Sequence, residues 1–251
     1  MTAHIPAQPA REAAATRTVR QPTGLPGPAQ LPDERVVARV RAGEVALFEL
    51  IMRRYNRRLF RIARSILPDD AEAEDAVQDG YIRAYFQLAQ FRGPEGFASW
   101  LCRIVRNEAL MRLRRRAPAS DPLSALERPA HREAATADPC SPTANPEAAL
   151  HEAQLQRLLE AAIDELPEPF RSAFVLREVE QLSVAETAAC LGVEPATVKT
   201  RVHRARLLLQ RNMTAEVVSL LPRTFAFDGA RCDRLVGRVF ERLGVSARQW
   251  R

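Results

Sequence analysis

The sequence predicts an all-α protein: two small helical domains joined by a flexible linker, with a helix-turn-helix in the second domain. Three observations support this fold class. Apolar residues recur at three- and four-residue intervals over 31–116 and again over 147–213. The stretch between them, 117–146, is rich in Pro, Ala, Ser, Asp and Glu and shows little periodicity. Near the end of the second stretch, Gly192 separates a short helical pattern from a strongly basic one.

The composition indicates a basic protein that can bury real cores. The 251 residues include 37 Lys+Arg against 31 Asp+Glu, and 46% are hydrophobic. Arginine supplies most of the positive charge and suits phosphate and guanine contacts. An anionic membrane surface would also attract this charge, but clustering of arginine on particular predicted helices favours nucleic acid. The four cysteines contain no C-x-x-C pair, and no apolar run reaches transmembrane length, so we expect a reducing cytoplasm.

The N-terminal part begins with a stretch, 1–30, that has almost no large apolar residue and is predicted to be a disordered tail. Helical periodicity starts at Leu31 and is interrupted near Gly43. Over 55–67 the apolar residues are predicted to face inward. Four arginines are predicted to face solvent on the same helix: Arg57, Arg58, Arg61 and Arg64.

Two more helices complete the predicted first domain. Residues 71–86 have an acidic first half that complements the helix dipole, and Gly80 inside them is predicted to cost about 1 kcal/mol relative to alanine. Residues 97–116 carry aromatic residues beside arginines, a combination that suits base stacking together with phosphate contact. For Phe97 and Trp100, packing in the core is the alternative.

The predicted second domain has two amphipathic helices, 147–166 and 169–180, followed by the helix-turn-helix. Ser183 and Glu186 have the spacing of a capping box that begins its first helix. Pro195 suits the first turn of its second helix, where a missing N–H costs nothing.

The helix predicted over 195–210 divides into an apolar and a cationic face. Its inward residues are Val198, Val202, Ala205 and Leu209, and its outward residues are Lys199, Arg201, His203, Arg204 and Arg206. No acidic residue lies between Pro195 and Met213. Because an ordinary solvated face usually mixes both signs of charge, this pattern favours a helix that enters the major groove of DNA.

Other classes of protein explain less of the sequence. A zinc site of Cys190, His203 and Cys232 matches no common ligand spacing. An enzyme acting on DNA through Glu72, Asp75 and Asp79 would have these acids on more than one helix face and no nucleophile elsewhere. A plain helix-turn-helix regulator leaves the acidic helix and the aromatic–arginine helix unexplained. We therefore expect no catalytic residue, no metal and no cofactor.

The chain resembles the extracytoplasmic-function (group IV) sigma factors, which direct bacterial RNA polymerase to promoters, in three segments: AEDAVQDGYIRAY, FRGPEGFASWLCRIVRNEALMRLRRR and LPEPFRSAFVLREVEQLSVAETAACLGVEPATVKTRVHRAR. The resemblance implies that 31–116 is sigma region 2 and that 147–213 is sigma region 4. It also implies three partners: core RNA polymerase, promoter DNA and an anti-sigma factor.

The resemblance further implies which residues bind. The acidic helix would dock on clamp helices of the largest polymerase subunit through Asp75, Gln78 and Asp79. The residues that would open and hold the minus-ten element are Phe91, Phe97, Trp100, Arg103, Arg106 and Asn107. Among them, Asn107 would hold one flipped base. The minus-thirty-five element would be read by Thr197, Lys199, Thr200, Arg201, His203 and Arg204.

Two features depart from the family pattern. Gly80 stands where the family usually has a larger residue, which is predicted to soften the polymerase-binding helix. The C-terminal extension, 214–251, continues past the usual end and contains apolar residues that predict a further short helix. Two alternatives remain open for this helix: it packs back on the second domain, or it makes a regulatory contact.

Overall fold

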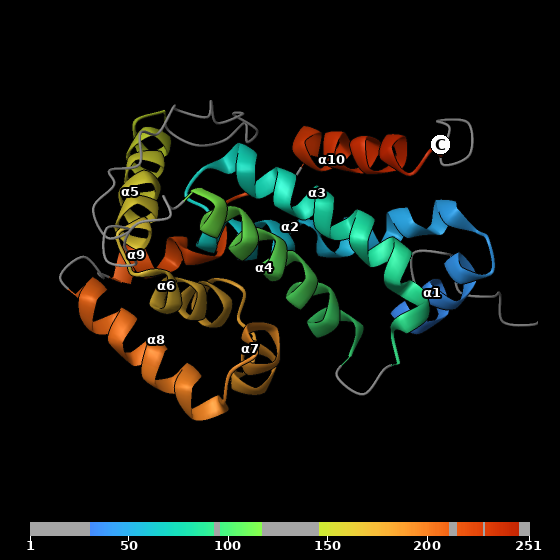
Figure 1. Cartoon of the computed structure of the whole chain (residues 1–251). Helices are drawn as coiled ribbons and strands as arrows, with labels where there is room; N and C mark the ends of the chain where they lie inside the picture. Colours follow the sequence, from blue (N-terminus) through green and yellow to red (C-terminus); the bar gives the residue numbers. More distant parts are fainter. Residues whose placement is uncertain (1–30, 93–95, 117–145, 211–214, 228, 246–251) are drawn as a thin grey trace, which may run out of the picture.

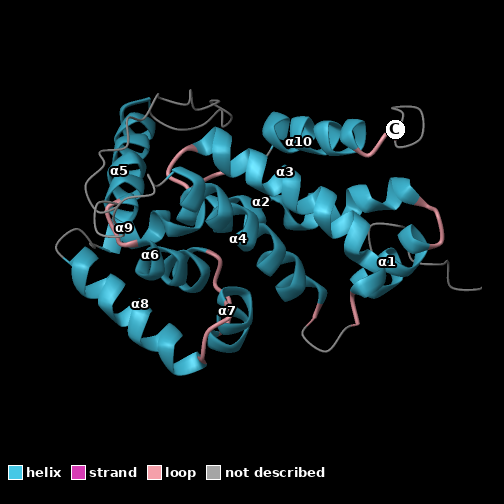
Figure 2. Cartoon of the chain, viewed as in Figure 1, coloured by secondary structure: helices cyan, strands magenta, loops and turns pink. Residues whose placement is uncertain are grey.

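The structure of the chain is a computed structural model that describes residues 31–92, 96–116, 146–210, 215–227 and 229–245. The predicted N-terminal tail, 1–30, and nearly all of the predicted linker, 117–146, lie outside these residues. Figure 1 shows the arrangement of the helices, and Figure 2 shows that the described part of the chain contains helices and loops. This confirms the all-α prediction.

The first domain is built from four of the described helices. Their bounds are α1 Asp33–Arg41, α2 Phe48–Ile66, α3 Asp70–Gln87 and α4 Phe97–Arg116. A 3-10 turn, Val45–Leu47, leads into α2, and another, Leu88–Gln90, follows α3. The helices α2, α3 and α4 contact one another in all three pairs and enclose a common apolar core. Thus each face that the periodicity predicted to be apolar finds a partner within this domain.

A glycine sets how closely α3 and α4 approach each other. A Cβ atom added at Gly80 would lie 2.5 Å from Cγ2 of Val105 on α4 and 3.3 Å from its Cα. The prediction that Gly80 merely weakens α3 was therefore incomplete. The propensity cost remains, but an alanine would not relieve it because its methyl group has no room.

The second domain contains the predicted helix-turn-helix. Its elements are α5 Pro146–Asp164, α6 Glu168–Phe174, a π-helical turn Val175–Val179, α7 Val184–Leu191 and α8 Pro195–Leu209. Both hydrogen bonds of the predicted capping box between Ser183 and Glu186 are present. Gly192 ends α7 with φ +61°, a left-handed conformation that glycine adopts without strain. These local predictions are confirmed.

The two domains pack against each other through arginines of α2. Arg61 and Arg64 were predicted to face solvent, and this is wrong: they are 2% and 1% exposed. Arg64 donates to both carboxylate oxygens of Asp164 at the end of α5, at 2.8 and 2.7 Å, and to Asp70 at 2.7 Å. Arg61 donates to Glu180 at 2.5 Å. The reason is that the second domain covers this side of α2 and supplies carboxylates to it.

A third buried arginine completes the junction from the other side. Arg171 of α6 donates to the backbone carbonyls of Ser65 at 2.5 Å and Ile66 at 3.3 Å, at the C-terminal end of α2. Those carbonyls have no partner within their own helix, so the guanidinium satisfies acceptors that burial would otherwise leave unpaired.

The C-terminal extension contacts both domains. It contains α9 Ala215–Leu220, a 3-10 turn Leu221–Arg223 (η7) and α10 Gly229–Arg242. The predicted helix exists as α10, but it lies on α2 and α3 of the first domain (Figure 1). The alternative that this helix packs back on the second domain is therefore wrong. Contacts of the extension with α5 of the second domain come instead from α9 and from the residues after it, up to Phe225.

We predict that Gly80→Ala destabilises the protein. The added methyl group would overlap Val105 and force α3 and α4 apart, which should cost about 1–3 kcal/mol. Gly237→Ala is the matched control, because a Cβ at this position of α10 meets nothing within 4 Å and should raise stability by about 0.4–1 kcal/mol. Thermal and urea unfolding followed by circular dichroism measures both variants. Equal effects of the two substitutions would contradict the close approach.

Candidate nucleic-acid interface

The outer face of α8 is cationic and free of carboxylates. The residues predicted to face inward, Val198, Val202, Ala205 and Leu209, are all buried, as predicted. On the opposite face Lys199, Thr200, His203 and Arg204 are exposed, while Thr197 and Arg201 are half-buried. Arg206 forms an ion pair with Glu178 at 2.7 Å, so its charge is partly neutralised. The remaining side chains form a compact group of donors on one helix.

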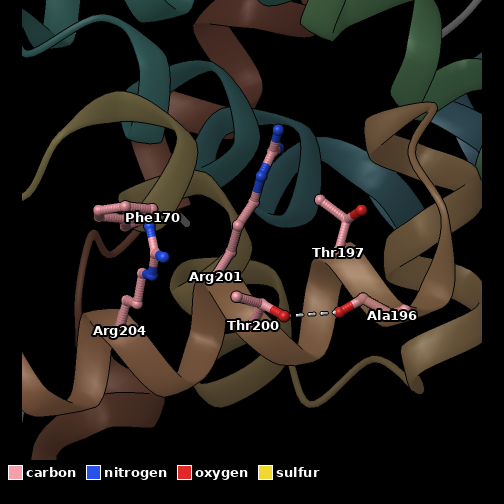
Figure 3. A pocket seen from close by; sticks show the side chains of 6 residues that line it. All are labelled: Phe170, Ala196, Thr197, Thr200, Arg201 and Arg204. Atoms are coloured by element: carbon pink, nitrogen blue, oxygen red, sulfur yellow. Dashed lines mark hydrogen bonds between the residues drawn. The ribbon is translucent and has the colours of Figure 1, made fainter.

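A shallow hollow of about 350 Å³ lies between α8 and the start of α6. It is lined by Phe170, Ala196, Thr197, Thr200, Arg201 and Arg204 (Figure 3). Figure 3 shows Arg201 and Arg204 extending from the same side of α8, and the Arg204 guanidinium lies 6.0 Å from the centre of the Phe170 ring. The hydroxyl of Thr200 donates to the backbone carbonyl of Ala196 at 3.1 Å. Two guanidinium groups that extend from one side of the helix can contact a phosphate or the edge of a guanine.

The second predicted nucleic-acid surface combines the loop before α4 with one side of that helix. Phe91, Phe97 and Trp100 form a cluster with ring centres 5.3–5.5 Å apart. Phe97 is 2% exposed, so it acts as a packed base for the other two rings, which are half-buried. Asn107 is exposed two helical turns after Trp100. The arrangement leaves aromatic surface and one amide accessible along α4.

Arg103 and Arg106 on α4 are both half-buried. Burial lowers the pKa of Arg106 from its usual value; the Glu168 carboxylate opposes this shift, and the positive charge of Arg201 adds to it. Arg106 and Arg201 were predicted to contact two different DNA elements. In this structure the two surfaces therefore lie close enough for their charges to repel each other.

The residues on the acidic side of α3 differ in how exposed they are and in whether arginines pair with them. Asp75 is exposed and lies 4.0 Å from Arg112 of α4, whereas Gln78 is 8% exposed. Asp79 is half-buried and accepts hydrogen bonds from Arg112 and, at 2.7 Å, from Arg242 of α10. Burial alone would raise the pKa of Asp79, but these two hydrogen bonds outweigh it and lower that pKa. The carboxylate is therefore held in its charged form.

Two contributions to these surfaces were missed in the sequence. Phe170, which supports Arg204, gave no signal beyond its place in an amphipathic helix. Arg231 and Arg242 of α10 did give one: the extension has arginines at three- and four-residue intervals, Arg231, Arg234, Arg238 and Arg242. Of these, Arg231 pairs with Asp70 and Glu74 of α3, and Arg242 pairs with Asp79.

The described residues include three of the cysteines, which are among the side chains that can bind metal ions. Cys102 and Cys190 are buried, as predicted for core residues, and their thiols contact each other between α4 and α7. Hydrogen bonding to Cys190 and burial raise the pKa of Cys102. Within the described ranges no three His, Cys, Asp or Glu side chains come together to hold a metal ion. None of the described helices is both long and apolar enough to cross a membrane.

Comparison with known proteins gives two family matches, "Sigma-70 region 2" over residues 51–118 and "Sigma-70, region 4" over residues 156–209. The chain is 34% identical over 180 residues to the ECF RNA polymerase sigma-E factor of Escherichia coli K12, covering 70% of this chain and 92% of that protein. It is 32% identical over 177 residues to the RNA polymerase sigma-H factor of Pseudomonas aeruginosa, covering 69% and 90%. The solved structure of CnrH in complex with the cytosolic domain of CnrY is similar in fold, with a TM-score of 0.50 and 24% identity over 71% of this chain and 95% of CnrH.

Proposed function

Because the chain belongs to the extracytoplasmic-function sigma factors of RNA polymerase, we propose that it binds core polymerase and directs transcription to specific promoters. The observation that carries this proposal is the presence of two surfaces suited to nucleic acid, one on each domain. A sigma factor needs both, because it recognises one promoter element as duplex and opens another.

The second domain reads the minus-thirty-five element through α8. Arg204 lines the hollow beside the Phe170 ring, and its neighbours supply further donors: Thr197, Lys199, Thr200, Arg201 and His203. Base edges in the major groove present acceptors that arginine and lysine can pair with, and nearby phosphates attract the same charges. The absence of carboxylates on α8 favours both contacts.

The first domain acts at the minus-ten element through α4. Phe91 and Trp100 offer ring faces on which an unstacked base can rest, supported from beneath by Phe97. Arg103 and Arg106 suit the adjacent phosphates. Asn107 offers one acceptor and two N–H donors at the exposed side of the helix, enough to hold the edge of one extruded base.

Core polymerase docks on the acidic side of α3. Asp75 is the residue best placed to make a direct charged contact, since it is exposed and only weakly paired. Asp79 can contribute once it is released from Arg242. Gln78 is buried at the edge of this side, so its contribution is mainly to shape.

Promoter binding requires the two domains to move apart. The minus-ten and minus-thirty-five elements are about 25 base pairs apart, roughly 85 Å along the duplex at ~3.4 Å per base pair. In this structure Arg106 of the first domain and Arg201 of the second instead lie close enough for their charges to influence each other. The 29 residues of 117–145 connect the domains. At ~3.4 Å per residue such a length can reach about 100 Å when extended, so the connection permits the separation.

The chain contributes binding and duplex opening, and the chemistry of RNA synthesis belongs to the polymerase, so we assign it no catalytic residue. Core polymerase and promoter DNA place its action in the cytoplasm. An anti-sigma factor that binds these same surfaces remains part of the proposal as a third partner.

The polymerase assignment predicts a charge effect at one exposed position. Asp75→Lys should weaken binding to purified core polymerase and lower promoter-specific transcription, because it reverses a charge at the docking surface. Glu34→Lys makes the same change on an exposed position of α1 and should leave both unchanged. Binding is measured by competition with a labelled sigma factor. A regulator that acts without core polymerase would bind promoter DNA while showing no core affinity at all.

The recognition helix predicts a difference between two neighbouring arginines. Arg204→Ala should weaken binding to the upstream promoter element by about 1–3 kcal/mol if it reads a base. If Arg204 touches only phosphate, the loss should be similar on all sequences and the salt slope should fall by about one. Arg206→Ala is the control and should have a smaller effect, since Glu178 already pairs with Arg206. Unaltered affinity of the Arg204 variant at every salt concentration would refute both versions.

Asn107 predicts a defect confined to opening of the duplex. Asn107→Asp keeps the shape of the side chain but removes its N–H donors, so open-complex formation and transcription should fall while initial promoter binding through α8 persists. Permanganate footprinting measures the opened bases. A template mismatched at the melted positions should rescue the variant, and equal defects on paired and mismatched templates would exclude this role.

A further inference from the structure

The residues after the second domain form a segment that spans both domains, and we call its described part, 215–227 and 229–245, the strap. In the strap, α9 lies against α5, and η7 lies against the π-helical turn that follows α6. Beyond them α10 lies alongside α3 and on α2 (Figure 1). The strap therefore crosses the junction at which the two domains meet.

The middle of the strap is bonded to both sides of this junction. On the first-domain side, Arg61 donates to the backbone carbonyls of Pro222 and, at 3.4 Å, of Phe225. On the second-domain side, Glu160 accepts from the Phe225 N–H at 2.9 Å. Phe225 is buried with φ +52°, a conformation that a bulky residue keeps only when its surroundings hold it there, and the Arg64 guanidinium lies 4.7 Å from its ring centre. These contacts tie one backbone segment to both domains.

An aromatic stack anchors the next part of the strap to the first domain. The rings of Phe227 and Phe60 are stacked with centres 4.5 Å apart. The guanidinium of Arg231, in the first turn of α10, lies 4.5 Å from the Phe60 ring centre and 5.0 Å from that of Phe227. From this point α10 buries Leu235, Val236, Val239 and Phe240.

The charges of α10 complement those of α3 along its length. Arg231 lies 2.7 Å from Glu74 and 3.3 Å from Asp70, near the start of α3. Arg242 lies 2.7 Å from Asp79, which follows Glu74 by five residues on α3. Because Asp79 belongs to the side assigned to polymerase docking, α10 occupies part of the surface that the polymerase would need.

We propose that the strap is an internal inhibitor: α10 competes with core polymerase for the acidic side of α3, and the segment Leu221–Phe227 holds the two DNA-binding domains together. This inference rests on the proposed function, because it takes α3 as the polymerase-docking helix. Release of the strap removes the Arg242 partner of Asp79 and the strap's own bonds across the domain junction in one step. In the intact protein, only the molecules with an open strap can bind core polymerase, so the apparent affinity is lowered in proportion to the fraction that is open.

The first experiment weakens the strap without touching α3. Arg231→Glu with Arg242→Glu replaces the attractive pairs to Glu74, Asp70 and Asp79 by repulsion. Arg234→Glu with Arg238→Glu is the matched control, with the same charge change at exposed positions of the same helix. The full-length release variant should bind core polymerase at least about fivefold more tightly than the wild type, and the control should stay within about twofold of it. Circular dichroism verifies that both remain helical.

A second variant and a second readout keep the test independent of any single substitution. Asp233 is exposed and lies 2.9 Å from Arg53 of α2, so Asp233→Arg should also loosen α10 and raise core affinity. Cys232 of α10 is half-buried, and the side-chain amide of Asn56 donates to its sulfur at 2.8 Å. Alkylation of Cys232 by N-ethylmaleimide, followed by peptide mass spectrometry, therefore reports whether α10 has left α2.

The outcomes separate the inference from the function on which it rests. Faster alkylation of Cys232 when core polymerase is added, together with tighter binding by the release variants, supports the strap as an inhibitor. Two results would overturn the inference while leaving the sigma-factor assignment intact, provided that the protein binds core polymerase normally. One is that Cys232 is equally protected from alkylation before and after core polymerase is added. The other is that both release variants bind with unchanged affinity. Failure of the wild type and of every release variant to bind core polymerase overturns the proposed function and the inference together.

Discussion

The burial of one guanidinium group, that of Arg64, determines how the parts of this chain fit together. Asp70 of α3 and Asp164 of α5 neutralise it, and the ring of Phe225 covers it. A buried charge without partners is costly, so both domains and the strap are held where their groups surround Arg64. When the domains separate, water can solvate both Arg64 and Asp164. The junction can therefore open without leaving an uncompensated charge inside either domain. An interface that kept one of the two charged groups buried after separation could not do so.

Local structure followed closely from the sequence, because it depends on neighbouring residues. The capping box at Ser183, the end of α7 at Gly192 and the bounds of α4 are all as predicted. Periodicity along one helix, however, reports only which face is apolar and not what else covers that helix. Arg61 and Arg64 had the spacing of a solvent face, and carboxylates a hundred or more positions away in the chain turned that face into an interior. Such distant partners leave no trace in a single-helix pattern.

The candidate sites show the same division. The donors of α8 could be assigned from the sequence, since an acid-free basic face has few other uses. The sequence could not show that Phe97 lies beneath Phe91 and Trp100, because an aromatic residue suits a core and a stacking surface equally. For the extension, the apolar residues of α10 predicted a helix but not its place. The arginines of α10 and the acids of α3 are visible in the sequence, but which of them pair could be seen only once both helices were placed side by side.

The contact between Gly80 and Val105 has a consequence for how this sequence can change. The two positions share one fixed volume between α3 and α4, and interiors packed to this density do not absorb an added methyl group locally. A side chain at position 80 is compatible with the same helix spacing only if position 105 becomes smaller in compensation. Substitutions at these two sites, 25 residues apart, should therefore occur in pairs, and each change made alone would be selected against even though both residues lie outside every assigned binding surface.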